Sequence, residues 1–309
     1  MSIRDRNPSI ELLRVLMVFG ICWLHAITTC ARINSPLSRI NYFLYPCVVG
    51  FVFITGWFGI SFSWRRLLKL YGVAAYCALV AWLVHALESG RYSIGPVLAI
   101  LKDNWFLKGY VVVMLFAPIV NLALERKPAL KTFAPFLALV FGWSFLACAP
   151  RLGELIPQSP GLTAYSGITL LGTYLAARIV RVYDLEARLK NVAIWVIPVS
   201  ILAVALHYGS YASPFALILA AFTFLWIKDC HVGKSEKLWF LMSPSLFSVF
   251  LLHASPYGFS LMTRGELWLI HHGVQTDASY LLVACATFVV AFILDIPRRV
   301  VLSLWKRYI

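Results

Sequence analysis

Apolar residues fill long blocks of this chain, and short polar stretches separate the blocks. Most blocks are close to the ~20 residues that a helix needs to cross a bilayer. The strands of a membrane barrel would instead alternate apolar and polar residues over about 10 positions, a pattern that this chain lacks. The pattern predicts an all-α, polytopic membrane protein with about ten transmembrane helices, at residues 10–30, 40–62, 66–88, 104–124, 131–149, 161–182, 191–209, 211–228, 238–262 and 278–303.

The composition supports this fold class. Hydrophobic residues make up 61% of the 309 positions and charged residues only 13%, whereas soluble domains have about 45–50% apolar and about 25% charged residues. The seven cysteines are odd in number and most lie within apolar blocks, so we interpret them as small hydrophobic residues. We expect one transmembrane domain over residues 1–309, with no separate soluble domain and no cleavable signal peptide.

The distribution of positive charge predicts an orientation. With ten spans, 19 of the 27 Lys and Arg residues fall on the side of the two termini and seven on the opposite side, while Arg14 lies inside the first span. Cytoplasmic loops of membrane proteins carry an excess of Lys and Arg. Both termini are therefore predicted to be cytoplasmic, and the net charge of +14 reflects membrane orientation and not a nucleic-acid partner.

The first span contains ionisable residues, which are costly in an apolar helix. Arg14 and His25 are eleven positions apart, so at about 100° and 1.5 Å per residue they share one helix face and lie about 16 Å apart along the axis. Glu11 lies one turn before Arg14, the right spacing for an ion pair. Arg14 alone is equally compatible with snorkelling to the headgroups. His25 lies too deep for that, and we predict a functional role, because a neutral imidazole suits proton transfer.

Four segments in order resemble one known family. Arg14 and His25, with ten residues between them, are similar to the first-span signature of the acyltransferase 3 family of integral membrane proteins. Three further segments resemble other family motifs: FVFITGWFGISFSWRRLLKLY (51–71), NWFLKGYVVVMLFAPIVN (104–121) and PSLFSVFLLHASPYG (244–258). Lys69 stands where the family often has Arg, and Phe250 where Tyr is common.

The resemblance implies a chemistry. Family members move an acyl group, usually acetyl, from a cytoplasmic acyl-CoA to a hydroxyl of a sugar or polysaccharide. The resemblance also implies that the protein lies in a bacterial plasma (inner) membrane. Arg65, Arg66 and Lys69 would then contact the phosphates of the acyl-CoA, and Arg14 would guide the thioester. His25 would act either as general base or as the group that accepts the acyl chain, and the sequence leaves both open. Acyl-CoA is expected as donor substrate, with no permanently bound cofactor and no metal.

Other side chains are candidates for the same site. His253 should lie at the same depth as His25, about 22 Å from the cytoplasmic end of its own span, as a site residue or a buried structural histidine. Trp105 and Tyr110 are expected near the outer side, as acceptor-binding residues or as membrane anchors. Asp295 is expected to pair with the nearby basic residues Arg298 and Arg299.

Two rival functions remain at this point. A transporter or flippase of lipid-linked sugars would suit the composition, but transporters often show paired repeats with interrupted helices, which we do not find here. A membrane sensor or scaffold with a histidine pH switch is the second rival. The expected partners are acyl-CoA, a glycan or lipid-linked sugar, and membrane lipids, while the acceptor sugar, the length of the acyl group and the oligomeric state stay open.

Overall fold

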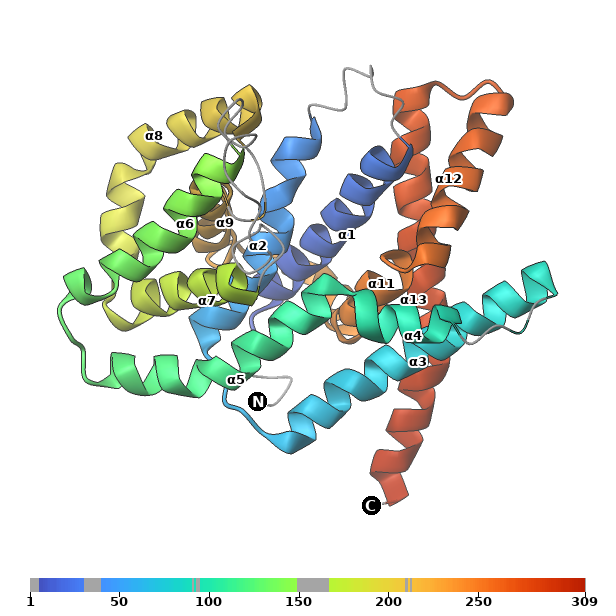
Figure 1. Ribbon diagram of the computed structural model, residues 1–309, viewed down its shortest axis with the longest axis horizontal. Coiled ribbons are helices and arrows are strands. Elements are labelled where there is room, and N and C mark those ends of the chain that lie inside the picture. The colour runs from blue at the N-terminus through green and yellow to red at the C-terminus, as the bar shows by residue number, and fades with distance from the viewer. Residues whose placement is uncertain are drawn as a thin grey trace. The chain divides into compact units, whose positions relative to one another are not determined.

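The protein is helical throughout the part that the structure describes. A computed structural model describes residues 6–30, 40–90, 92, 95–148, 167–208, 211 and 213–308, and no strand occurs among them. The helices are drawn in Figure 1 and are α1 (Pro8–Cys30), α2 (Ile40–Phe58), α3 (Trp64–Ser89), α4 (Gly95–Asp103), α5 (Trp105–Glu125), α6 (Ala134–Cys148), α7 (Gly167–Val182), α8 (Glu186–Ala203), α9 (Pro214–Ile227), α10 (Glu236–Met242), α11 (Leu246–His253), α12 (Pro256–His271) and α13 (Thr276–Tyr308). The predicted all-α fold class is confirmed.

The chain divides into two compact units, each made of separated segments. The first unit comprises Met1–Ser38, Arg65–Asn104 and Val232–Ile309, and the second comprises Arg39–Trp64 and Trp105–His231. The first unit thus contains α1, almost all of α3, α4 and α10 to α13, and the second contains α2 and α5 to α9. The prediction of a single domain stays a prediction, and each unit is described by itself below.

The first unit is built around α1. The Asn7 side-chain oxygen accepts a hydrogen bond of 2.9 Å from the Ser9 N–H, Pro8 follows at the first helical position, and Glu11 lies in the first turn. These are the residues that favour a helix start, because the first N–H groups have no partners within the helix. The apolar side chains of α1 then pack against α10, α11, α12 and α13, so that Leu24 and Ala26 are fully buried.

Helix α13 contains a buried ion pair. Asp295 is fully buried, and Arg298 donates to its two carboxylate oxygens at 2.6 and 2.8 Å. Arg298 also donates to the Pro244 carbonyl at 3.2 Å, which ties α13 to the turn before α11. The predicted pairing of Asp295 is confirmed for Arg298.

A sharp bend separates α11 from α12. The Ser255 hydroxyl accepts the Gly258 N–H at 3.0 Å and caps α12, and Pro256 occupies the first helical position. The region from Glu236 to His271 is bent there by 81°. The prediction of one continuous helix over 238–262 is therefore wrong, because Ser255 and Pro256 end one helix and start another.

The second unit packs α2 and α5 closely against α7. A Cβ atom on Gly56 would come within 2.5 Å of the Tyr174 carbonyl oxygen, and one on Gly109 within 2.7 Å of the Leu170 side chain. Small residues of this kind let membrane helices approach each other. The fully buried Tyr174 donates its hydroxyl proton to Asn121 at 2.9 Å, and Asn121 in turn donates to the Ile60 carbonyl at 2.9 Å.

The helices of the described residues match most of the predicted positions. Six of them are long and apolar enough to cross a membrane, or seven if the bent pair counts as one span. Helices α6, α7 and α9 lie within the predicted blocks 131–149, 161–182 and 211–228 but are shorter, with 15, 16 and 14 residues. The count of about ten and the cytoplasmic location of both termini stay predictions, and residues 161–166 lie outside the described part.

Candidate active site

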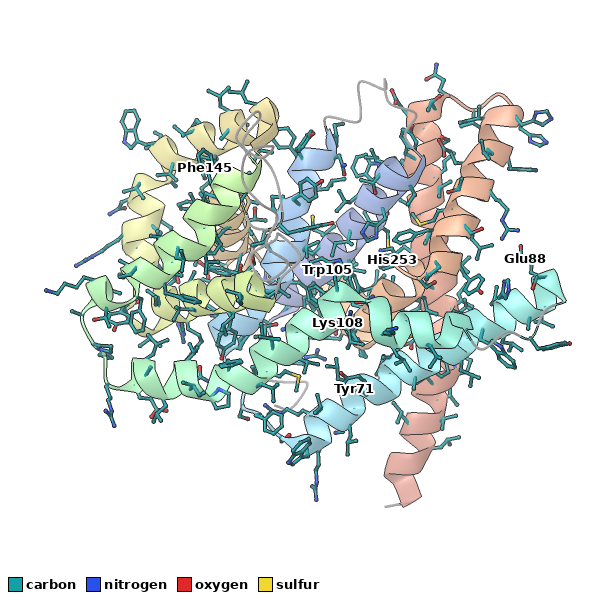
Figure 2. All side chains as sticks on the ribbon, in the orientation of Figure 1. Tyr71, Glu88, Trp105, Lys108, Phe145 and His253 are labelled. Atoms are coloured by element: carbon teal, nitrogen blue, oxygen red, sulfur yellow. The ribbon has the colours of Figure 1, made fainter. Side chains whose placement is uncertain are left out.

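Two histidines from opposite ends of the chain form a hydrogen-bonded pair in the first unit. His25 Nδ1 lies 2.9 Å from His253 Nε2, and the ring centroids are 5.0 Å apart. His25 is on α1, five residues before that helix ends, and His253 is the last residue of α11; Figure 2 labels His253 there. The two imidazoles are in contact, as a common depth would require, and their depth in the membrane stays a prediction.

The second ring nitrogen of His253, Nδ1, is also hydrogen-bonded. His253 Nδ1 lies 2.7 Å from the carbonyl oxygen of Val249, one helical turn earlier. His253 is only 1% exposed, whereas His25 is partly exposed. The pair therefore has a buried member, held by the backbone, and a member with accessible surface.

An aromatic ring packs against each histidine of the pair. The Phe259 ring meets the His25 ring edge to face, with centroids 5.2 Å apart, and Phe250 meets His253 in the same way at 5.6 Å. Such contacts hold imidazole rings in place and keep water from their faces. Phe250 brings no hydroxyl group to the histidines.

The charged end of α1 forms a second cluster. Arg14 donates to Glu11 at 2.8 Å, which confirms the predicted ion pair. Arg6 contacts the same Glu11 oxygen at 3.1 Å and donates to the Ser243 hydroxyl at 3.1 Å. Because Glu11 is only 2% exposed, this network buries a carboxylate between two guanidinium groups. No contact found among the described residues joins Arg14 to His25.

The predicted acyl-CoA ligands lie in the first turns of α3. Arg65, Arg66 and Lys69 are all exposed, and a helix N-terminus favours anions. Their contact with acyl-CoA phosphates stays a prediction.

Trp105 and Tyr110 belong to the second unit, where both lie on α5. Trp105 packs against Phe106 and Tyr211 with ring centroids 5.8 and 5.2 Å apart, and Figure 2 labels it at the start of that helix. Tyr110 stacks on Phe106 at 6.1 Å. These contacts make both residues part of an aromatic cluster, and their role in acceptor binding stays a prediction.

Sequence reasoning missed three parts of the site. The Val249 carbonyl could have been found from its position four residues before His253 on a helix. The Ser255-Pro256 pair signals a new helix start, and with it the bend that leaves His253 at a helix end. Nothing in the sequence pattern pointed to Phe259, because its contact with His25 depends on how α1 and α12 pack.

Comparison with known proteins gives one match. A sequence model of one family of acyltransferase domains, acyltransferase 3, matches residues 7–296. The match covers nearly the whole chain and includes both histidines. No curated protein and no solved structure matches. The predicted family is thus confirmed, and the chain belongs to the acyltransferase 3 family of acyltransferases.

Proposed function

We propose that the protein transfers an acyl group, with acetyl as the first candidate, from a cytoplasmic acyl-CoA to a hydroxyl of a cell-surface or lipid-linked glycan. The observation that carries the proposal is the pair of His25 and His253 in a chain of this family. An imidazole that is partly exposed and held by a second ring is suited to take a proton from an attacking hydroxyl. It is equally suited to take the acyl group itself.

The charges of the chain support an acyl-CoA donor. Acyl-CoA carries phosphates, which form strong charge-assisted hydrogen bonds with Arg and Lys. Arg65, Arg66 and Lys69 are exposed at the start of α3, on the side that the positive-inside rule assigns to the cytoplasm. We assign them to the donor phosphates, and Arg14 to guiding the thioester towards His25.

The acceptor side of the proposal rests on the aromatic residues of the second unit. Sugar rings stack on aromatic side chains, and Trp105 and Tyr110 are half-buried members of such a cluster. We assign them to acceptor binding at the outer side of a bacterial inner membrane. In this arrangement both termini are cytoplasmic and the chain crosses the membrane about ten times.

The test uses membranes that contain the full-length protein. Release of CoA thiol from acetyl-CoA is measured for the wild type, His25→Ala and His85→Ala at equal expression. His85 is the matched control, because it lies on α3, where it is hydrogen-bonded to Ser89 and packs against Tyr257 with ring centroids 4.3 Å apart. We expect His25→Ala to lose about 10²–10⁴-fold of the acceptor-dependent rate, the usual contribution of general acid–base catalysis, and His85→Ala to retain it.

Analysis of the cell glycans completes the test. Base-labile acetyl groups should disappear with His25→Ala and persist with His85→Ala. Acetyl groups at wild-type levels in His25→Ala cells would show that His25 is not required. A flippase would move the lipid-linked sugar without releasing CoA thiol.

A further inference from the structure

The contacts of His253 determine which of its nitrogens carries a proton. A neutral imidazole has one N–H group, which donates, and one bare nitrogen, which accepts. The Val249 carbonyl oxygen can only accept, so the hydrogen bond of 2.7 Å from His253 Nδ1 requires the proton on Nδ1. In the neutral ring, His253 Nε2 is then the bare nitrogen.

The bare nitrogen of His253 also determines which nitrogen of His25 carries a proton. Its Nδ1 lies 2.9 Å from His253 Nε2, and since that nitrogen is bare, His25 Nδ1 must supply the hydrogen. A neutral His25 therefore has its bare nitrogen at Nε2, on the other side of the ring. A charged imidazolium on His253 would reverse this direction, but such a charge is costly at a position that is only 1% exposed and packed among apolar helices.

We infer that His253 is a positioning residue that holds His25 as the Nδ1–H tautomer, so that Nε2 of His25 is the reactive atom. The role of Nε2 in the reaction rests on the proposed function, whereas the tautomer assignment does not. The arrangement has the same logic as a catalytic histidine oriented by a carboxylate, where the partner at Nδ1 selects the tautomer and stabilises the imidazolium that forms. Here a second, neutral imidazole occupies the place of the carboxylate.

Both routes left open by the sequence use the same atom. In direct transfer, the hydroxyl proton goes to His25 Nε2, the hydroxyl oxygen bonds to the acyl carbon, the C–S bond breaks, and the CoA thiolate takes the proton back from Nε2. In the two-step route, Nε2 bonds to the acyl carbon and the thiolate leaves; the hydroxyl then displaces His25, and its proton neutralises the thiolate. The Nδ1 proton stays in the bond to His253 in both routes.

The direct test is the protonation pattern of His25 in the full-length protein. Purified protein with ¹⁵N-labelled histidine is studied in lipid nanodiscs by NMR, and the His25 signals are assigned by their loss in His25→Ala. We expect a proton on Nδ1 and a bare Nε2 in the wild type. A proton on Nε2 would overturn the inference, whatever the activity of the protein.

Variants of His253 test whether it is responsible. In His253→Gln the amide oxygen lies near the former position of Nε2 and still accepts the His25 hydrogen, so the tautomer and a rate within about tenfold of wild type should persist. His253→Leu removes the acceptor, so His25 should show both tautomers and kcat should fall about 10²-fold or more, with an unchanged KM for the donor. A wild-type tautomer and kcat in His253→Leu would contradict the inference.

His272→Gln is the matched control. His272 Nδ1 lies 2.8 Å from the Trp268 carbonyl, four residues earlier, which repeats the bond of His253 without a second imidazole at hydrogen-bond distance. This variant should change neither the His25 signals nor kcat. If the wild type shows the predicted tautomer but releases no CoA from any acyl-CoA, the proposed function fails and the tautomer assignment stands.

Discussion

At the scale of single residues, the charges of α1 show how an ion network is kept inside an apolar bundle. Glu11 is contacted by Arg14 at 2.8 Å and by Arg6 at 3.1 Å, and only 2% of its surface is exposed. A buried carboxylate is tolerated when cations and hydrogen bonds compensate for the lost water. Because Glu11 has two partners and each arginine has only this one carboxylate among the described residues, the three side chains are not equivalent.

This difference predicts an order of stabilities. Glu11→Ala leaves two partly exposed guanidinium groups without their counter-ion, and we expect a loss of about 1–3 kcal/mol of unfolding free energy. Arg14→Ala leaves Glu11 paired with Arg6 and should cost less, and Arg14→Lys, which retains a single contact, should cost least and keep part of the activity. Thermal unfolding in detergent measures the order. Equal destabilisation by Glu11→Ala and Arg14→Lys would contradict this order.

At the scale of helices, the bend between α11 and α12 decides where His253 lies. Ser255 and Pro256 start α12, and Gly258 allows its backbone to pass close to the end of α11. A Cβ atom on Gly258 would be 2.3 Å from the His253 carbonyl oxygen and 2.5 Å from that of Leu252. The geometry that ends α11 at His253 therefore depends on a position where only glycine fits.

Two glycines of α12 make a matched pair for testing this. Gly258→Ala should force the two helices apart, lower the thermal midpoint and reduce acyl transfer, because His253 loses its distance to His25. A Cβ atom on Gly265 would have one neighbour, a Val283 methyl group at 3.8 Å, which is an ordinary van der Waals distance. Gly265→Ala should therefore behave like the wild type. Both are measured by thermal unfolding and CoA release, and a Gly258→Ala protein as stable and active as Gly265→Ala would contradict this account of the bend.

At the scale of the whole molecule, the residues that were predicted to act in the reaction are found in both units. His25, His253, Glu11, Arg14 and the basic residues of α3 belong to the first unit, and Trp105 and Tyr110 to the second. The family model spans both units. The acid–base part of the proposed reaction therefore lies within one unit, and the proposed acceptor contacts lie in the other.

The orientation in the membrane is tested with the native cysteines. Cys230 is exposed in the segment after α9, on the side that the charge distribution assigns to the cytoplasm. In a variant that retains only Cys230, a membrane-impermeant maleimide should label inside-out vesicles and not intact cells. Cys285, exposed but within the apolar α13, is the control and should not react from either side. Labelling of Cys230 in intact cells would reverse the predicted orientation.

The sequence by itself determined the fold class, the approximate position of most helices and the family, and it named both histidines as candidate site residues. These follow from local properties: the length of apolar blocks, the eleven-residue spacing of Arg14 and His25, and the order of short motifs. The pairing of Glu11 with Arg14 and of Asp295 with Arg298 was predictable for the same reason, since residues one helical turn apart meet wherever a helix forms.

Only the tertiary structure decided how His25 and His253 meet and which nitrogens they use. The two residues are 228 positions apart, and no periodicity relates side chains on separate helices. Their contact depends on the packing of α1 against α11 and α12, on the bend at Ser255 and on the backbone carbonyl of Val249. A hydrogen bond has a direction, and that direction exists only once donor and acceptor atoms are brought within about 3 Å of each other.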